Sequence, residues 1–214
     1  MAVLLHVDAS ARSSRSLSRD LSRAFVDAWT AARPDDTVVR RDVGRDPPPA
    51  VTEAWIAAAF TPSEERSTEQ AAILSPSDTL VDEVLRANIV VVGTPMYNYG
   101  MPAALKAWVD QVIRIGRTFT FDLARGEQPI EPVQTGKTLV TLTASGEGGF
   151  APGGPHAAVN HLDTHLGATM HLFGCSTQHV VRIEYQEFAD ARHEASIAAA
   201  HREVLALARE LAAQ

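Results

Sequence analysis

Short apolar segments alternate along the chain with segments of helical periodicity, and this alternation constrains the fold more than any other feature. The clearest apolar segment is Ile89–Gly93, which contains no polar residue. A strand of this kind needs cover on both faces, as in a parallel sheet between two layers of helices. Four further strands are predicted, at 3–7, 37–41, 139–143 and 180–183.

Helical periodicity fills the intervals between these strands. Large apolar residues recur at every fourth position from Leu17 to Trp29 and predict an amphipathic helix that ends near Ala32. Five strands alternating with helices predict a doubly wound parallel α/β sheet with helices on both faces, in a single domain spanning 1–214. The other helices are predicted at 52–60, 63–87, 102–113, 155–168 and 188–213.

Two places depart from this regular pattern. Pro76 lies inside the helix predicted at 63–87 and is expected to weaken or break it. Phe119 and Phe121 alternate with threonines, which predicts a short exposed strand or hairpin.

Composition excludes several classes of protein. The chain has 214 residues and a net charge of −7, which argues against general nucleic-acid binding. It has no apolar run near the roughly 20 residues that span a bilayer, so no membrane association is expected. Cys175 is the one cysteine, so neither an intrachain disulfide nor a cysteine-based zinc site is possible. These features indicate a cytoplasmic protein in which Cys175 is a small buried apolar residue.

A ligand of a doubly wound sheet lies beyond the carboxyl ends of the strands, where the strand order reverses. The loops expected there are 8–18, 94–100 and 144–150. The first is rich in serine and opens a helix, so hydroxyl groups and free N–H groups could bind a phosphate without lysine. Serine is also a common helix cap, which is the alternative explanation. Neither a dinucleotide glycine triad nor a Walker motif is present, which favours a mononucleotide.

The other two loops suit the rest of such a ligand. Residues 94–102 contain two tyrosines and two methionines, which can form the wall of a flat aromatic group. A tight turn packed by its own aromatic residues is the alternative. Residues 143–150 are rich in glycine, so their backbone can approach a ligand edge closely, although a mobile surface loop would have the same composition.

Several of these segments together resemble the FMN-dependent NADH-azoreductase family of flavodoxin-like quinone reductases. The resemblance covers essentially the whole chain. It rests on Ser10, on Ser16-Leu17-Ser18, and above all on the block 94–121, which includes Pro95-Met96-Tyr97-Asn98-Tyr99. It implies a flavodoxin-like sheet with the strand order 2-1-3-4-5. The chain departs from the family mainly at 144–149, where relatives often have Ser-Arg-Gly-Gly.

The resemblance also implies a cofactor, FMN, and the residues that hold it. Ser10, Ser16, Leu17 and Ser18 would bind the phosphate. The isoalloxazine ring would lie against Pro95, Met96, Tyr97, Asn98 and Tyr99, and against Ala144, Ser145, Gly146, Glu147, Gly148 and Gly149. Tyr99, Phe121 and Phe150 would shape the substrate pocket. The family implies a homodimer, so Phe121 would act at the site of the partner subunit.

The implied activity is a two-electron ping-pong transfer. NADH or NADPH would reduce FMN, and a quinone or an aromatic azo compound would then be reduced in its place. Because the cofactor carries the hydride, we nominate no catalytic side chain and no metal ligand.

Two other functions stay open at this point. A small non-enzymatic electron carrier would use the same fold and the same phosphate site. The modest charge and the additional segment 119–135 favour the enzyme. A metal site is the second alternative, because histidines gather between His156 and His171 and because His161 and His165 are one helical turn apart.

Overall fold

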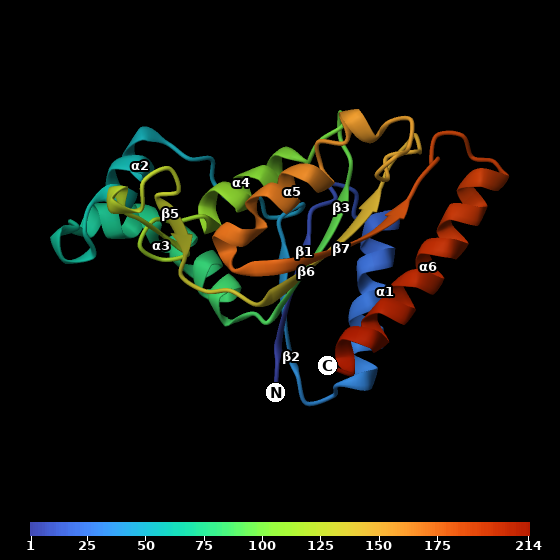
Figure 1. The fold of residues 1–214 in the computed structure, drawn as a ribbon, viewed down its shortest axis with the longest axis horizontal. Helices are drawn as coiled ribbons and strands as arrows, with labels where there is room; N and C mark the ends of the chain where they lie inside the picture. Colours follow the sequence, from blue (N-terminus) through green and yellow to red (C-terminus); the bar gives the residue numbers. More distant parts are fainter.

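The computed structural model describes residues 1–214 and has a five-stranded sheet at its centre (Figure 1). Every neighbouring pair of strands in this sheet is parallel. The strand order is β2-β1-β3-β6-β7, which confirms the expected order 2-1-3-4-5. The strands are β1 (Val3–Asp8), β2 (Thr37–Asp42), β3 (Ile89–Pro95), β6 (Lys137–Ala144) and β7 (Cys175–Ile183).

Two long helices cover one face of the sheet. They are α1 (Leu17–Ala32) and α6 (Ala191–Ala212), and they lie side by side in Figure 1. The four-residue repeat from Leu17 to Trp29 gives α1 its apolar stripe, with Leu21, Phe25 and Trp29 fully buried or nearly so.

The opposite face carries α3 (Thr68–Arg86), α4 (Ala103–Val112) and α5 (Asp163–Thr169). A further helix, α2 (Glu53–Phe60), packs on α3 through a small apolar cluster of its own. None of the helices combines the length and the apolar character that crossing a membrane requires.

Alternate side chains of the central strand enter two separate cores. In β3, Val91 packs on the side of α1 and α6, whereas Val90 and Val92 pack on the side of α3 and α4. Each core contains 18 buried residues, so neither face of the sheet is left to water. This double burial is the physical reason for the uninterrupted apolar run in the sequence.

The helix predicted at 63–87 is present but starts later. A capping box formed by Ser67 and Gln70 begins α3, and residues Ser63–Glu65 form only a separate 3-10 turn. The helix runs through Pro76 without a break. A proline inside a helix removes one backbone hydrogen bond, and here the packing of α3 against α2 and α4 compensates for that loss.

The prediction of a helix at 155–168 is wrong for the first half of this range. The structure has a 3-10 turn at Ala157–Val159, and α5 begins only at Asp163. Between them, the side-chain oxygen of Asn160 accepts hydrogen bonds from the N–H groups of Leu162 and Asp163. A side chain that satisfies backbone donors in this way replaces the helical ladder.

The last two elements also differ from their predicted bounds. β7 starts five residues before the predicted strand at 180–183. The prediction missed this first half because most of its residues are polar, as is common in a strand at the edge of a sheet. α6 begins at Ala191 rather than at 188, since the side chain of Asp190 caps it by accepting the N–H of Arg192.

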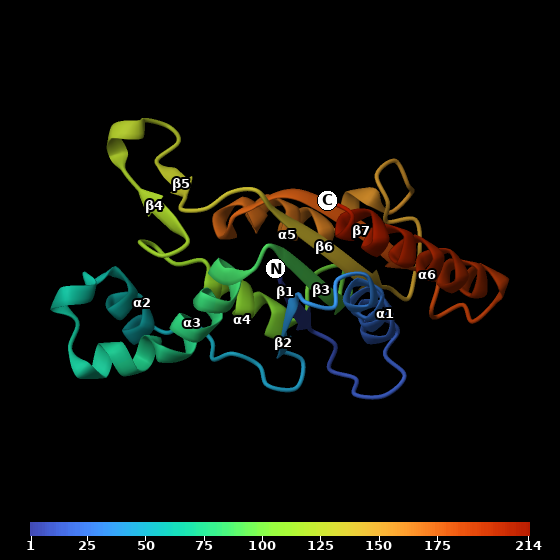
Figure 2. The same cartoon turned by 90° about the horizontal axis from the view of Figure 1, so that it is seen from below.

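A short hairpin stands off from the body of the molecule, as Figure 2 shows. It pairs β4 (Phe119–Phe121) with β5 (Ile130–Pro132) in antiparallel register, so the expected hairpin is confirmed.

Cys175 is buried at the start of β7, where burial raises the pKa of its thiol to about 12. A thiol reacts through its thiolate, so we expect the native protein to react only very slowly with an aromatic disulfide reagent at about pH 8. Protein unfolded in guanidinium should react at the rate of a free cysteine. Rapid reaction of the native protein, followed by absorbance, would contradict the placement of Cys175.

Candidate functional site

The loops after β1, β3 and β6 meet at one edge of the sheet. The chain order reverses between β1 and β3, which is where a doubly wound sheet opens a crevice for a ligand. A cavity of about 350 Å³ lies there. Residues from the three predicted loops line it, together with two from the segment after β7: Ser10, Arg12, Arg15, Ser16, Leu17, Ser18, Pro95, Met96, Tyr97, Ala144, Gly146, Gln186 and Glu187.

One end of this cavity is built from the start of α1. Ser16 is the N-cap, and its hydroxyl accepts the N–H of Arg19. The N–H groups of Leu17 and Ser18 come earlier in the helix and have no intrahelical acceptor. The Ser16 and Ser18 hydroxyls lie 3.4 Å apart, and both side chains are buried, as is that of Ser10. This end therefore concentrates hydrogen-bond donors and the positive end of the helix dipole.

Two arginines add positive charge to the same end. Arg12 and Arg15 line the cavity, and the sequence analysis did not nominate them. Their position in the serine-rich loop could have identified them from the sequence. Arg15 also has φ = 53°, a left-handed conformation that few residues adopt without a stabilising surrounding structure.

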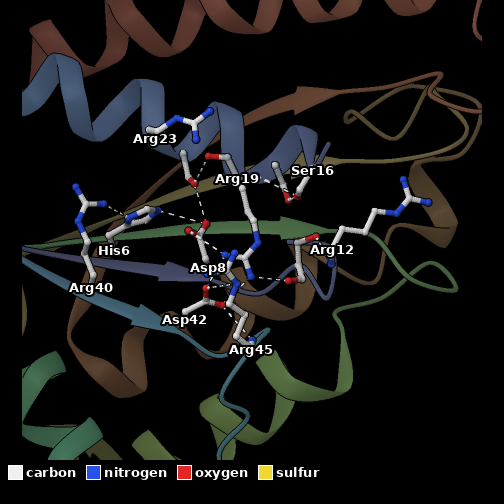
Figure 3. Close-up of polar contacts among 12 residues, drawn as sticks. His6, Asp8, Arg12, Ser16, Arg19, Arg23, Arg40, Asp42 and Arg45 are labelled. Carbon is white, nitrogen blue, oxygen red and sulfur yellow. Dashed lines mark hydrogen bonds and ion pairs between the residues drawn. The ribbon is translucent and has the colours of Figure 1, made fainter. Parts of the chain in front are cut away.

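A polar network lies beneath the serine loop (Figure 3). Arg19 donates to both carboxylate oxygens of Asp42 at 2.7 Å and to the Ser10 carbonyl oxygen at 2.6 Å. Asp8 lies 3.5 Å from Arg19 and accepts a hydrogen bond from Ser22. The hydrogen bond with Asp42 raises the pKa of Arg19 above its ordinary value. Burial alone would raise the pKa of Asp42, but Arg19 more than offsets this and lowers it.

The loop after β3 is held in a strained two-residue turn. Tyr97 and Gly100 exchange backbone hydrogen bonds of 2.9 and 3.0 Å. The two residues between them, Asn98 and Tyr99, have φ values of 48° and 64°. Left-handed backbone costs about 1–2 kcal/mol for a residue with a side chain. Strain of this kind is found where the surrounding structure fixes a functional residue.

A second cavity of about 250 Å³ adjoins the first. The rings of Tyr99 and Phe150 lie 6.2 Å apart along it, and the Tyr99 hydroxyl is 3.4 Å from a carboxylate oxygen of Glu147. Met96, Gly146 and Glu187 line both cavities, so the two are direct neighbours. The residues that line this second cavity are Met96, Asn98, Tyr99, Ser145, Gly146, Glu147, Phe150 and Glu187.

The loop after β6 is fixed by the segment after β7. The N–H groups of Gln186 and Glu187 donate to the carbonyl oxygens of Ser145 and Gly146. The carboxylate of Glu184 accepts the N–H groups at 149 and 150. This pairing brings Gln186 and Glu187 into the cavity. Sequence reasoning missed both, because no local motif marks them.

Three of the nominated residues lie outside both cavities. Gly148 lies under the ring of Tyr185, where a Cβ atom would come within 2.2 Å of the ring, so it serves close packing. Gly149 has φ = 83° and supports the turn of the loop. Phe121 lies half exposed on the β4–β5 hairpin, away from the cavities of its own chain.

The histidines between His156 and His171 do not form a metal site. No three His, Cys, Asp or Glu side chains come together in a group that could hold a metal ion. Nδ1 of His156 instead makes a hydrogen bond of 2.7 Å with the carbonyl oxygen of Gly148.

The two cavities together suit a ligand with an anionic end and a flat aromatic end. Hydroxyl groups, free helix N–H groups and two guanidinium groups form one end, which matches a phosphate. Met96, Tyr99 and Phe150 supply apolar and aromatic surface at the other end, beside backbone that Gly146 allows a ligand to approach. The donor set therefore fits a flavin mononucleotide.

Known proteins are similar to this chain in sequence and in fold. A family model described as a flavodoxin-like fold matches residues 2–208. An FMN-dependent NADH:quinone oxidoreductase 2 of Colwellia psychrerythraea is 48% identical over 99% of this chain and 100% of its own. An FMN-dependent NAD(P)H:quinone oxidoreductase 1 of Pseudomonas aeruginosa is 43% identical over 98% and 99% of the two chains. The crystal structure of an azoreductase from Bacillus anthracis has a TM-score of 0.86 at 27% identity, over 98% of this chain and 100% of that one.

These similarities extend over nearly the whole chain, and they confirm the resemblance noted in the sequence. The chain belongs to the flavodoxin-like family that includes the FMN-dependent NADH:quinone oxidoreductases.

Proposed function

We propose that this protein is an FMN-dependent oxidoreductase that uses NADH or NADPH to reduce quinones and aromatic azo compounds. The observation that carries the proposal is the pair of adjoining cavities, with phosphate-type donors at one end and an aromatic wall at the other. The names of relatives at 43–48% identity support the cofactor and the quinone acceptor. The azoreductase of similar structure supports azo compounds as further acceptors.

The residues of the serine loop would hold the cofactor phosphate. The hydroxyls of Ser10, Ser16 and Ser18 and the N–H of Leu17 would donate hydrogen bonds to it, and Arg12 and Arg15, which also line the cavity, would add positive charge. Because α1 presents its N-terminus here, the donors are in place before the ligand arrives, and little free energy is spent on ordering them.

The other two loops would hold the ring system. Residues 95–99 and 144–149 form its two walls, largely through backbone groups. When bound, FMN supplies the hydride chemistry between a nicotinamide and the acceptor. The chain excludes water with Phe150 and Met96, and it leaves the half-exposed Tyr99 beside the space in which a flat acceptor would lie. No side chain is required as an acid or base.

One donor and one acceptor would use this space in turn, which is a ping-pong scheme. The flavin ring would take up the second cavity, about 250 Å³, so the nicotinamide and the acceptor would lie in turn against the ring beside the half-exposed Tyr99. Relatives named as NADH:quinone and NAD(P)H:quinone oxidoreductases, at 43–48% identity, favour the enzyme over the electron carrier.

We further propose that the protein is a homodimer. Four large apolar side chains on or next to the β4–β5 hairpin are exposed: Phe121, Leu123, Ile130 and Val133. Exposed apolar residues gathered on one projecting element are typical of a protein interface. The hairpin stands away from the rest of its own chain (Figure 2), so Phe121 would reach the cavity of the partner subunit.

The activity is tested by absorption spectroscopy of the purified protein with FMN. We expect the bound flavin bands to bleach when NADH is added without oxygen and to return when a benzoquinone follows. Free FMN treated in the same way is the control. Bound FMN that NADH does not reduce would indicate an electron carrier instead, and failure to bind FMN would contradict the proposed function.

The phosphate end is tested by Ser16→Asp. Aspartate caps a helix as well as serine does, so the Tm should hold, whereas its charge repels a phosphate. We expect the Kd for FMN, measured by quenching of flavin fluorescence, to rise by about 100-fold. Ser16→Asn, an equally good cap without charge, is the matched control and should change the Kd far less. Equal affinities in the two variants would place the phosphate elsewhere.

The dimer is tested by Phe121→Asp. Since Phe121 is half exposed, its loss should leave the protomer folded, but a carboxylate in an apolar interface costs several kcal/mol. We expect light scattering to show dissociation at protein concentrations where the parent chain is a dimer. The control is Phe188→Asp, a residue of similar exposure in the segment between β7 and α6. A parent chain that is monomeric would refute the proposed dimer.

A further inference from the structure

Two carboxylates lie next to each other beneath the serine loop. Asp8 ends β1 and Asp42 ends β2, and the two are paired in the register of these parallel strands. Both side chains are largely withdrawn from water, with exposed fractions of 17% and 33%. Partly buried like charges repel each other, so the fold needs a cation between them. Arg19 of α1 supplies it, binding both oxygens of Asp42 and lying 3.5 Å from Asp8.

Arg19 makes one further contact, which is not needed to neutralise the two carboxylates. Its Nη2 also donates to the Ser10 carbonyl oxygen at 2.6 Å. Gly44 lies beside both groups, because a Cβ atom there would come within 2.2 Å of the Ser10 oxygen and 2.9 Å of Arg19 Nη2. The Ser10 carbonyl is therefore held in a narrow slot lined by the guanidinium group of Arg19 and by Gly44.

The direction of this carbonyl decides what the loop presents to a ligand. In a trans peptide the C=O of Ser10 and the N–H of Ala11 point in opposite directions. With the oxygen bound to Arg19, the N–H of Ala11 points away from Arg19. A carbonyl oxygen repels a phosphate, and because Arg19 does not line the cavity, its hydrogen bond draws the Ser10 oxygen away from an anion bound there.

The charge of Arg19 acts mainly on its own partners. It is shared between Asp8 and Asp42, and the side chain does not line the cavity. His6 and Arg45 complete the network, with His6 Nε2 3.4 Å from Asp8 and Arg45 3.5 Å from Asp42. Arg19 therefore adds little net positive potential at the cavity, and its effect there is geometric.

We infer that Arg19 is a positioning residue for the phosphate of the cofactor and acts through the Ser10 carbonyl without touching the ligand. The inference deepens the proposed function and rests on it. It assigns to Gly44 a matching role: the absence of a side chain leaves the slot open for the carbonyl.

The test compares the affinities of the full-length chain for FMN and for riboflavin, which lacks the phosphate. Arg19→Lys keeps the charge but replaces the planar fork by a single ammonium group, which cannot hold both Asp42 and the Ser10 carbonyl in the same geometry. We expect the affinity for FMN to fall about tenfold and that for riboflavin to change less than about twofold. Arg23→Lys is the matched control, because Arg23 lies one turn further along α1 and pairs only with Asp20 at the surface.

A second variant guards against a general loss of structure. Gly44→Ala leaves every charge in place and crowds both the Ser10 carbonyl oxygen and Arg19 Nη2, so it disturbs the same contact without removing the guanidinium group. We expect the same selective loss of affinity for FMN, while the far-UV circular dichroism stays unchanged.

The inference is overturned if Arg19→Lys keeps the parent ratio of the two affinities, whatever Gly44→Ala does. This includes the case in which the affinities for FMN and riboflavin fall equally, since that result describes a merely structural role. A parent chain that binds both flavins equally well would instead refute the phosphate site of the proposed function. Failure of the inference and failure of the proposed function are therefore distinguishable.

Discussion

Burial of both faces of the parallel sheet is the constraint on which the rest of the structure depends. The side chains of β3 are buried in the two cores, so none of them is free on a face of the strand to contact a ligand. Chemistry is confined to the loops at the strand ends. The reversal of strand order at β1 and β3 then separates two of these loops and leaves space between them. The position of the site thus follows from how the core is covered.

The loops at this edge are not free to move, although they carry the strain of unusual backbone. Asn98, Tyr99 and Tyr185 all have positive φ. The first two are fixed by the paired hydrogen bonds of the turn, and the third lies in a segment bonded along its length to the loop after β6. Tyr99 is 45% exposed, so packing its own turn does not account for it. A residue held under strain and left half open is better explained by a ligand.

The fold and much of the site were predictable because they depend on local patterns. The apolar run at 89–92 reports burial on both faces, and the serine cluster before α1 reports a capped helix N-terminus. Gln186 and Glu187 were not predictable, since they enter the cavity through the register of two distant loops. The role of Asn160 was missed for a related reason. Its side-chain oxygen accepts hydrogen bonds from two backbone N–H groups, and these bonds delay the start of α5. They form only once the chain turns at this point.

An acidic chain that binds an anionic cofactor must solve a local problem of charge. The net charge is −7, and two of the carboxylates, Asp8 and Asp42, lie directly beneath the phosphate end. Arg19 balances them internally, which leaves the N-terminus of α1 together with Arg12, Arg15 and Glu187, the charged residues that line the cavity, to set the potential there. Long-range repulsion from the remaining surface charge is screened within about 8–10 Å at ordinary salt. In the proposed assignment of the phosphate, its affinity is therefore governed by the first turn of α1 and the loop before it, and the overall charge of the protein has little influence.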